Sequence, residues 1–420
     1  MLATLRHKNF ALLWSAGLIS LTGDWLLLIA LPIYVYTLTH STALTSVTFI
    51  VEALPSVLLG SVAGVFVDRW DRQRTMVAAN LAQAAGLLPL LAVRSTDQLW
   101  LIYTVSVVEA ILALFFVPAE QSLLPTLVDE ERLVAANALS ALNGNLARLA
   151  GAPLGGLVAG LLGLGGAVVL DAASFLLSSV LILTISTTGT ETGAAAPSAR
   201  VEHAAGADGS AVSAWTGLWR EWTAGLSLVR RGRTVSALFL VMAVQAVAQG
   251  LFLVLFIVFV ERALRNGPAA IGLLRGVQAI GGLLGGLTVA ALGRRLPMAS
   301  LVGLGAILFG LIDLAIWNAP TLAPAYALPL TVALFILVGL PGASMISGAT
   351  TLLQESVADA YRGRVFGAFA TTGALAQLMG MAAAGLLGDR LGVVPVLNSQ
   401  AGLYLLAGVL ALVLLSSPVP

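Results

Sequence analysis

The chain is a succession of long apolar runs separated by mostly short polar segments. The first run extends from Phe10 to about Leu38, and others follow at about 43–67, 75–93, 99–120, 134–162, 166–186, 234–260, 269–292, 298–318, 325–350, 364–388 and 395–416. A helix that crosses the hydrocarbon core of a bilayer needs about 20 apolar residues, a length that these runs approach or exceed. The pattern therefore predicts an all-α polytopic membrane protein with twelve transmembrane helices.

One polar break is much longer than the others and divides the runs into two sets of six. We expect an N-terminal half over 1–187, a cytoplasmic linker over 188–233 and a C-terminal half over 234–420. The first part of the linker is rich in Ala, Gly, Ser and Thr, which is typical of a flexible connection. Its second part has Trp215 and Trp222 at helical spacing among arginines. This spacing predicts an amphipathic helix, either at the membrane surface or packed on the protein.

Basic residues are distributed unequally between the alternate loops. With a cytoplasmic N-terminus, 15 Lys and Arg residues lie on the inner side, four lie on the outer side and two lie within helices. Short cytoplasmic loops carry an excess of Lys and Arg in membrane proteins. We therefore expect both termini and the linker in the cytoplasm, and a multi-pass protein of a bacterial cytoplasmic membrane.

The two halves also carry an internal repeat. Gly151 and Gly156 of the fifth run correspond to Gly380 and Gly385 of the eleventh, and each pair is 229 residues apart. Two six-helix halves with the same direction are parallel repeats about the membrane normal, and such repeats place a substrate site near the midplane between them.

Composition excludes several mechanisms. Charged residues make up only 10% of the chain, against about 25% in soluble domains. There is no cysteine, so disulfides, thiolate metal sites and cysteine nucleophiles are excluded. Lys8, the single lysine, has no glycines before it and cannot belong to a Walker A loop for ATP. The net charge of +1 argues against a nucleic-acid partner. We therefore expect neither enzymatic activity nor a metal or cofactor.

Ionisable residues within the apolar runs are candidates for function, because charges inside a membrane are costly. Asp24 and Arg148 each lie about 14 residues from the cytoplasmic end of their runs, so both are about 20 Å deep at 1.5 Å per residue. We expect the two to lie near each other in the N-terminal half. A proton on Asp24 would then release Arg148 and couple protons to transport; the alternative is a static salt bridge between the first and fifth helices.

Four further acids are interpreted by their depth. Glu52 and Glu109 lie about 9–10 residues from the outer end, and burial there favours a neutral carboxyl that could carry a proton, whereas a water-filled cavity would not. Asp171 is expected to be a structural cap near the start of the sixth helix. Asp313 and Arg275 are expected to pair as a clasp on the outer side.

The C-terminal half differs in its polar residues. The positions that correspond to Asp24 and Glu52 there are Leu253 and Gly281. Proton coupling is therefore assigned to the N-terminal half. Neutral hydrogen-bonding groups that could contact a substrate come from four glutamines of the C-terminal half: Gln245, Gln249, Gln278 and Gln377.

Two motifs resemble those of a known family. Gly64-x-x-x-Asp68-Arg69-x-x-Arg72 follows the second run, and Gly151-Ala152-Pro153-x-Gly155-Gly156 lies in the fifth. Together they resemble the major facilitator superfamily over nearly the whole chain, in the branch of drug:proton antiporters that includes macrolide-efflux proteins. Asp71 stands where the family has a glycine, and Glu109 lies in the fourth helix, where many drug exporters have a basic residue.

The resemblance implies roles for both motifs. In the family, the aspartate of the loop latches the outward-facing state, so this role falls to Asp68, with Arg69 and Arg72 as partners and Gly64 as the first residue of the motif. Gly151, Pro153, Gly155 and Gly156 match the antiporter motif of exporters. Close helix packing alone would also explain these glycines, since small residues let helices approach.

The combined interpretation is a secondary active exporter of lipophilic, cationic or neutral amphiphilic compounds in exchange for protons. We expect it to act as a monomer in the lipid bilayer, with its small-molecule substrate and protons as its partners and the proton gradient as its energy source. One alternative is a dedicated exporter or flippase for a single natural substrate, such as a siderophore or a lysophospholipid. Another is a non-transporting membrane sensor or assembly protein.

Overall fold

The computed structural model describes residues 2–67, 70–186, 232–292 and 296–415. All regular secondary structure in these ranges is helical, and eleven helices there are long and apolar enough to cross a membrane. The predicted amphipathic helix of the linker lies outside the described residues, as do Asp68 and Arg69.

The helices follow the predicted apolar runs closely. The first part of the chain forms α1 (Lys8–Thr39), α2 (Thr42–Val67), α3 (Arg72–Gly86), α4 (Leu99–Leu123) and α5 (Glu130–Leu183). The part after the linker forms α7 (Arg233–Val258), α8 (Pro268–Leu292), α9 (Met298–Leu322), α10 (Ala327–Ser356), α11 (Arg362–Leu391) and α12 (Val393–Leu415). Short 3₁₀ turns extend α3 at Leu88–Ala92, and a π turn extends α7 at Phe259–Ala263.

Helix α5 accounts for two of the twelve predicted spans. Its 54 residues would extend about 80 Å, far more than the roughly 30 Å of a bilayer core. The helix is interrupted at Gly163, where φ is 65° and ψ is −162°, a conformation that glycine adopts without strain. The two parts double back on each other. Trp14 donates to the carbonyl of Leu139 in the first part, and Asn9 donates to that of Ser186 just beyond the second.

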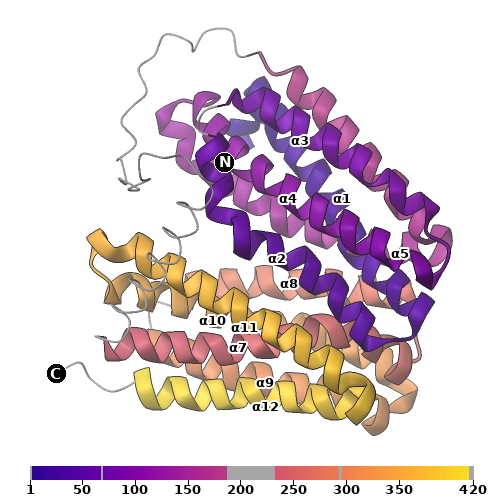
Figure 1. Cartoon of the computed structure of the whole chain (residues 1–420). Helices are drawn as coiled ribbons and strands as arrows, with labels where there is room; N and C mark the ends of the chain where they lie inside the picture. Colours follow the sequence, from indigo (N-terminus) through magenta and orange to yellow (C-terminus); the bar gives the residue numbers. More distant parts are fainter. Residues whose placement is uncertain (1, 68–69, 187–231, 293–295, 416–420) are drawn as a thin grey trace.

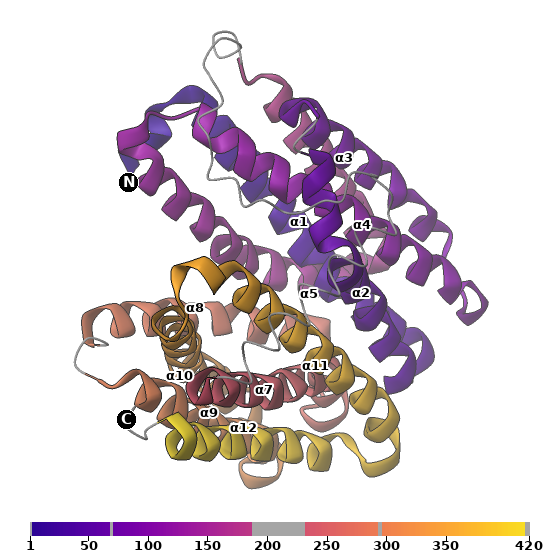
Figure 2. The same cartoon turned by 60° about the vertical axis from the view of Figure 1, so that its left-hand side comes forward.

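The helices form two bundles that meet at one end and diverge at the other. Figures 1 and 2 show α1–α5 in one bundle and α7–α12 in the second, with the start of α1 and the end of α12 at the diverging end. Glycines bring the bundles together at the other end. A Cβ on Gly156 of α5 would lie 2.8 Å from Cα of Gly272 of α8. In the same way, Gly385 of α11 packs against Ser46 of α2.

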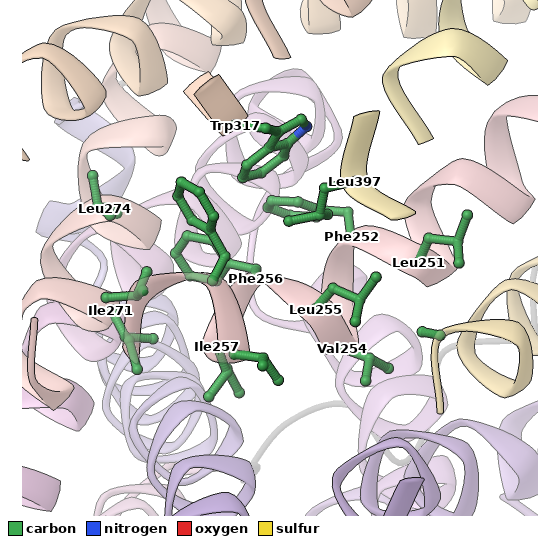
Figure 3. Packing of buried hydrophobic residues seen from close by; sticks show 14 of the residues in the cluster. Leu251, Phe252, Val254, Leu255, Phe256, Ile257, Ile271, Leu274, Trp317 and Leu397 are labelled. Atoms are coloured by element: carbon green, nitrogen blue, oxygen red, sulfur yellow. The ribbon is translucent and has the colours of Figure 1, made fainter. Parts of the chain in front are cut away.

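A large buried apolar cluster stiffens the second bundle near the end where the bundles meet. Figure 3 shows Phe252 and Phe256 of α7 beside Trp317 of α9, with Ile271 of α8 and Leu397 of α12 around them. Trp317 is fully buried, and its ring meets that of Phe252 at 6.0 Å between centroids. Helix α7 is thereby held at the centre of its bundle.

Candidate functional site

A cavity of about 980 Å³ lies between the two bundles. Helices α1, α2 and α5 line it from the first bundle, and α7 to α12 line it from the second. Aromatic and methionine side chains contribute to its wall. Six of them are Trp25, Phe49, Phe309, Phe369, Met242 and Met345. Pockets for small organic ligands have this size and this mixture of apolar walls with few polar groups.

The structure brings all four predicted glutamines to the cavity, together with Glu52 and Arg148. Gln249 accepts a hydrogen bond from the hydroxyl of Tyr404 at 3.2 Å. Gln278 accepts one from Nη1 of Arg275 at 3.4 Å. Nε2 of Gln245 is buried without a hydrogen-bond partner. The wall therefore offers hydrogen-bonding groups, among them an unused amide donor, that a substrate could contact.

The expected pair between Asp24 and Arg148 is not formed. Helices α1 and α5 do approach closely, because Gly151 packs on the backbone of Thr22. However, the two ion pairs among the described residues involve other side chains. Arg148 lines the cavity, whereas Asp24 does not. The two residues were predicted at one depth, but Asp24 faces the carboxyls of its own bundle.

The interior of the first bundle holds a group of carboxyls. Asp24 lies close enough to Glu52, Glu109 and Asp171 for its charge to act on each of them. Oε1 of Glu109 is buried without a hydrogen-bond partner. Asp171 was expected to cap a helix, but it lies well inside α5 and accepts the hydroxyl of Ser174 at 3.3 Å.

One more acid inside the first bundle was missed from the sequence. Oε1 of Glu120 lies 3.2 Å from the place where a Cβ on Gly17 of α1 would stand, near the amide of Asn143 of α5. The apolar run of the fourth helix was predicted to end at about 120, and Glu120 was not singled out as a candidate. The helix continues to Leu123, so Glu120 lies inside the helix and not at its end.

Asp313 of α9 does not form the expected clasp with Arg275. Its Oδ2 accepts from Nε2 of Gln400 at 2.9 Å, and Oε1 of Gln400 accepts from Nε1 of Trp317 at 3.0 Å. All three residues are at most 3% exposed. Arg275 instead lines the cavity and lies over the rings of Phe252 and Phe256.

A polar contact closes the end where the bundles meet. Asp389 at the end of α11 accepts from the backbone N–H of Thr42 at 2.9 Å and from its hydroxyl at 2.7 Å. Arg262 lies 3.5 Å from the same carboxylate and donates to the carbonyl of His40 at 2.9 Å. The contact, which we call the Asp389 clasp, joins α2 to α7 and α11. Sequence reasoning missed it because Asp389 falls one residue beyond its apolar run.

The predicted latch motif is described only in part. Gly64 lies within α2, and Arg72 is the exposed first residue of α3. Asp71, which replaces the family's glycine, accepts from the N–H of Arg74 at 2.7 Å. It therefore caps the N-terminus of α3, a position where Asp is strongly preferred.

The glycines of the fifth helix serve two contacts. Gly151 and Gly155 pack against α1, where a Cβ would meet the carbonyls of Thr22 and Leu26 at 2.5 Å. Gly156 and Pro153 point the other way, against α8 of the second bundle. The motif thus contacts both bundles, so a movement of one bundle relative to the other changes its packing. Among the described residues no group of three His, Asp or Glu side chains could hold a metal ion.

Comparison with known proteins identifies the family. Residues 13–320 match the Major Facilitator Superfamily. The chain belongs to this superfamily. Its relatives include macrolide efflux protein A of Streptococcus pyogenes, which is 24% identical over 92% of this chain and 90% of that protein. They also include the uncharacterized MFS-type transporter YfiS of Bacillus subtilis, which is 26% identical over 92% of this chain and 88% of that protein.

Solved structures of superfamily transporters share the fold. A bacterial homologue of the iron transporter ferroportin, in an inward-facing state, superposes with a TM-score of 0.73. It is 16% identical, and the match covers 98% of this chain and 99% of that one. The protein is accordingly a multi-pass membrane transporter of the major facilitator fold, and no catalytic activity is indicated.

Proposed function

We propose that this transporter is a proton-coupled antiporter that exports lipophilic or amphiphilic small molecules by alternating access. The cavity of about 980 Å³ between the bundles carries the proposal. Its aromatic and methionine walls suit hydrophobic bodies, and its glutamines supply neutral polar contacts. The likeness to a macrolide efflux protein over nearly the whole chain supports export of such compounds.

Proton coupling is assigned to the carboxyls of the first bundle. Glu52 lines the cavity, and Asp24, in the low-polarity interior of the first bundle, lies close enough to act on Glu52, Glu109 and Asp171. Several carboxylates in such a region cannot all be ionised together, so the group retains protons. Entry of a substrate beside Glu52 would change its surroundings and favour release of a proton. Arg148, on the same wall, adds a positive charge that would favour the ionised state of Glu52.

Alternating access requires opening the Asp389 clasp and closing the other end. With both termini in the cytoplasm, the clasp lies on the outer face and the cavity is accessible from inside. This orientation rests on the excess of basic residues in the predicted inner loops. Asp68, with Arg69 and Arg72, would latch the inner face after the bundles rock. The transporter would work as a monomer in the cytoplasmic membrane, with no cofactor.

Everted vesicles that overexpress the chain test this function. The lumen is first acidified by respiration, a panel of rhodamine 6G, macrolides and other amphiphiles is added, and lumenal pH is followed. We expect substrate-induced proton release that Glu52→Gln abolishes. Asp313→Asn, a buried acid outside the cavity, is the matched control and should retain release. Transport without proton movement would contradict antiport. Failure of every drug by folded protein would favour a dedicated exporter of one natural substrate.

A further inference from the structure

Two arginines from different bundles line the cavity without an acidic partner. Arg148 comes from α5, and Arg275 comes from α8. The ion pairs among the described residues are Arg262–Asp389 and Arg362–Asp359, so neither cavity arginine belongs to one. Glu52 lines the same cavity, yet no ion pair joins it to either guanidinium in this part of the chain.

The guanidinium of Arg148, which comes from α5, lies against the face of α8 that carries Arg275. Arg275, Gln278 and Gly282 follow one another at positions i, i+3 and i+7, which share a face of a helix, and all three line the cavity. Nη2 of Arg148 crosses from α5 to within 3.5 Å of the place where a Cβ on Gly282 would stand. The absence of a side chain at Gly282 therefore leaves room for Arg148, and Gln278 lies between the two charges.

The site has more donors than its own residues satisfy. Nε of Arg148 and Nε2 of Gln245 are buried without hydrogen-bond partners. A guanidinium has five N–H donors and no acceptor, and Arg275 gives one of its own to Gln278. The charged group that acts on Arg275 is Arg148 itself, which is repulsive. The aromatic faces of Phe252 and Phe256 compensate Arg275 only in part.

A half-buried cation in an apolar wall without a counter-charge is costly. A planar guanidinium matches the two oxygens of a carboxylate or phosphate in a bidentate manner. An acidic group between Arg148 and Arg275 would satisfy both charges and contact both bundles at once. The hydrophobic remainder of such a molecule would face the aromatic wall at Phe256 and Phe309.

We propose that Arg148 and Arg275 bind the anionic group of an amphiphilic substrate, a carboxylate, sulfonate or phosphate ester attached to an aromatic or other apolar body. The proposal rests on the transport function argued above and narrows its substrate class. It replaces the cationic or neutral substrates that the sequence predicted. Because one arginine comes from each bundle, the bound anion links the bundles.

Matched probes test this binding on the full-length protein in lipid nanodiscs. The probes are N-dansyl-phenylalanine, which is a carboxylate, its neutral amide, and the cation rhodamine 6G. We expect the carboxylate to bind at least about tenfold more tightly than the amide, as loss of a charge-assisted contact implies. Arg148→Gln and Arg275→Gln should each lower carboxylate affinity about tenfold or more and leave amide affinity within about threefold. Arg390→Gln, at an exposed arginine on α11, is the control and should change neither.

The comparison of probes on the unmodified protein needs no variant to fold. Equal affinity for carboxylate and amide, or tighter binding of rhodamine 6G, would overturn the anion site. Displacement of the carboxylate probe by millimolar chloride or inorganic phosphate, with no gain from its apolar body, would show a site for inorganic ions and would also overturn the proposal. Arg148→Lys and Arg275→Lys should recover part of the affinity, because they restore charge without the planar fork.

The vesicle assay separates this proposal from the function beneath it. Proton release driven by rhodamine 6G, together with no preference for the carboxylate probe, would leave proton-coupled export standing and remove the anion site. Absence of binding by every probe, together with absence of proton release, would count against both. Carboxylate binding without proton release would keep the anion site and remove antiport.

Discussion

The buried acids of the two bundles are treated very differently by their surroundings. In the second bundle, Asp313 accepts from Gln400, which in turn accepts from Trp317. In the first bundle, Asp24 makes no ion pair within the described residues, and Oε1 of Glu109 is buried without a partner. A carboxyl that accepts from a buried donor, itself oriented by another side chain, is held in place. A carboxyl with fewer such contacts can gain or lose a proton with less rearrangement.

The second bundle also has a buried aromatic cluster beside the hydrogen bonds of its acid. Phe252, Phe256, Phe259 and Phe335 of the second bundle surround Trp317 in one buried cluster. This cluster holds the donors of Asp313 in place. The second bundle thus presents a rigid wall to the cavity, and the first bundle carries groups that can change charge. Four predictions would break or sharpen this comparison.

The largest effect is expected from Trp317→Ala. The variant should lower the free energy of unfolding by about 3–5 kcal/mol, because it empties a fully buried aromatic site and leaves Gln400 without its donor. Chemical unfolding in mixed micelles would measure the change. Trp100→Ala is the control, since Trp100 is 61% exposed, and should cost less than about 0.5 kcal/mol. Equal costs would show that the cluster does not stiffen the second bundle.

Removing the acids themselves tests the comparison directly. Asp313→Ala should lower the free energy of unfolding by about 1–3 kcal/mol, because Nε2 of Gln400 then remains buried and unpaired. Asp24→Ala should cost less than about 1 kcal/mol, since it leaves no donor behind. The same unfolding assay at one pH compares the two. A cost for Asp24→Ala as large as that for Asp313→Ala would contradict the difference between the bundles.

The Asp389 clasp allows a test of movement between the bundles. Asp389→Asn weakens the contacts to Arg262 and Thr42, and should shift the equilibrium toward outward opening by about 1–2 kcal/mol. The chain has no cysteine, so a single Ser46→Cys, placed against Gly385, reports opening by its labelling rate with an impermeant maleimide. Labelling should become about tenfold faster.

Asp359→Asn is the control for the clasp. It removes an exposed i,i+3 pair with Arg362, and such pairs contribute at most about 1 kcal/mol. The labelling rate at the introduced cysteine should remain within about twofold of the unmodified background. Equal acceleration by both variants would mean that the clasp does not hold the bundles together.

The smallest change in stability is expected from Glu109→Gln. The amide has nearly the same shape, and no donor to Oε1 is lost, so the free energy of unfolding should change by less than about 0.5 kcal/mol. Substrate-driven proton release in vesicles should nevertheless fall. Glu355→Gln, at an exposed position at the end of α10, is the control and should change neither quantity. Unchanged proton release in Glu109→Gln would leave Asp24 and Glu52 as the carriers.

Much of the architecture could be predicted from the sequence because it depends on local properties. The length of each apolar run determined where a helix can cross a membrane, and the structure confirms the all-helical fold with two spans joined in α5 at Gly163. The neutral polar character of Gln245, Gln249, Gln278 and Gln377 within apolar runs also directed attention to residues that line the cavity. These features need no knowledge of neighbouring helices.

The partners of the charged residues were decided only by the tertiary structure. Counting residues along a helix gives depth, which is one coordinate of three. The rotation of each helix and the identity of its neighbour supply the other two. For this reason Asp24 and Arg148, which were predicted at one depth, do not pair, and Arg275 faces the cavity while Asp313 binds Gln400. The sequence determined where the helices lie along the chain. Which side chains meet was decided by how the helices pack, as in the close contact of Gly156 with Gly272 between the bundles.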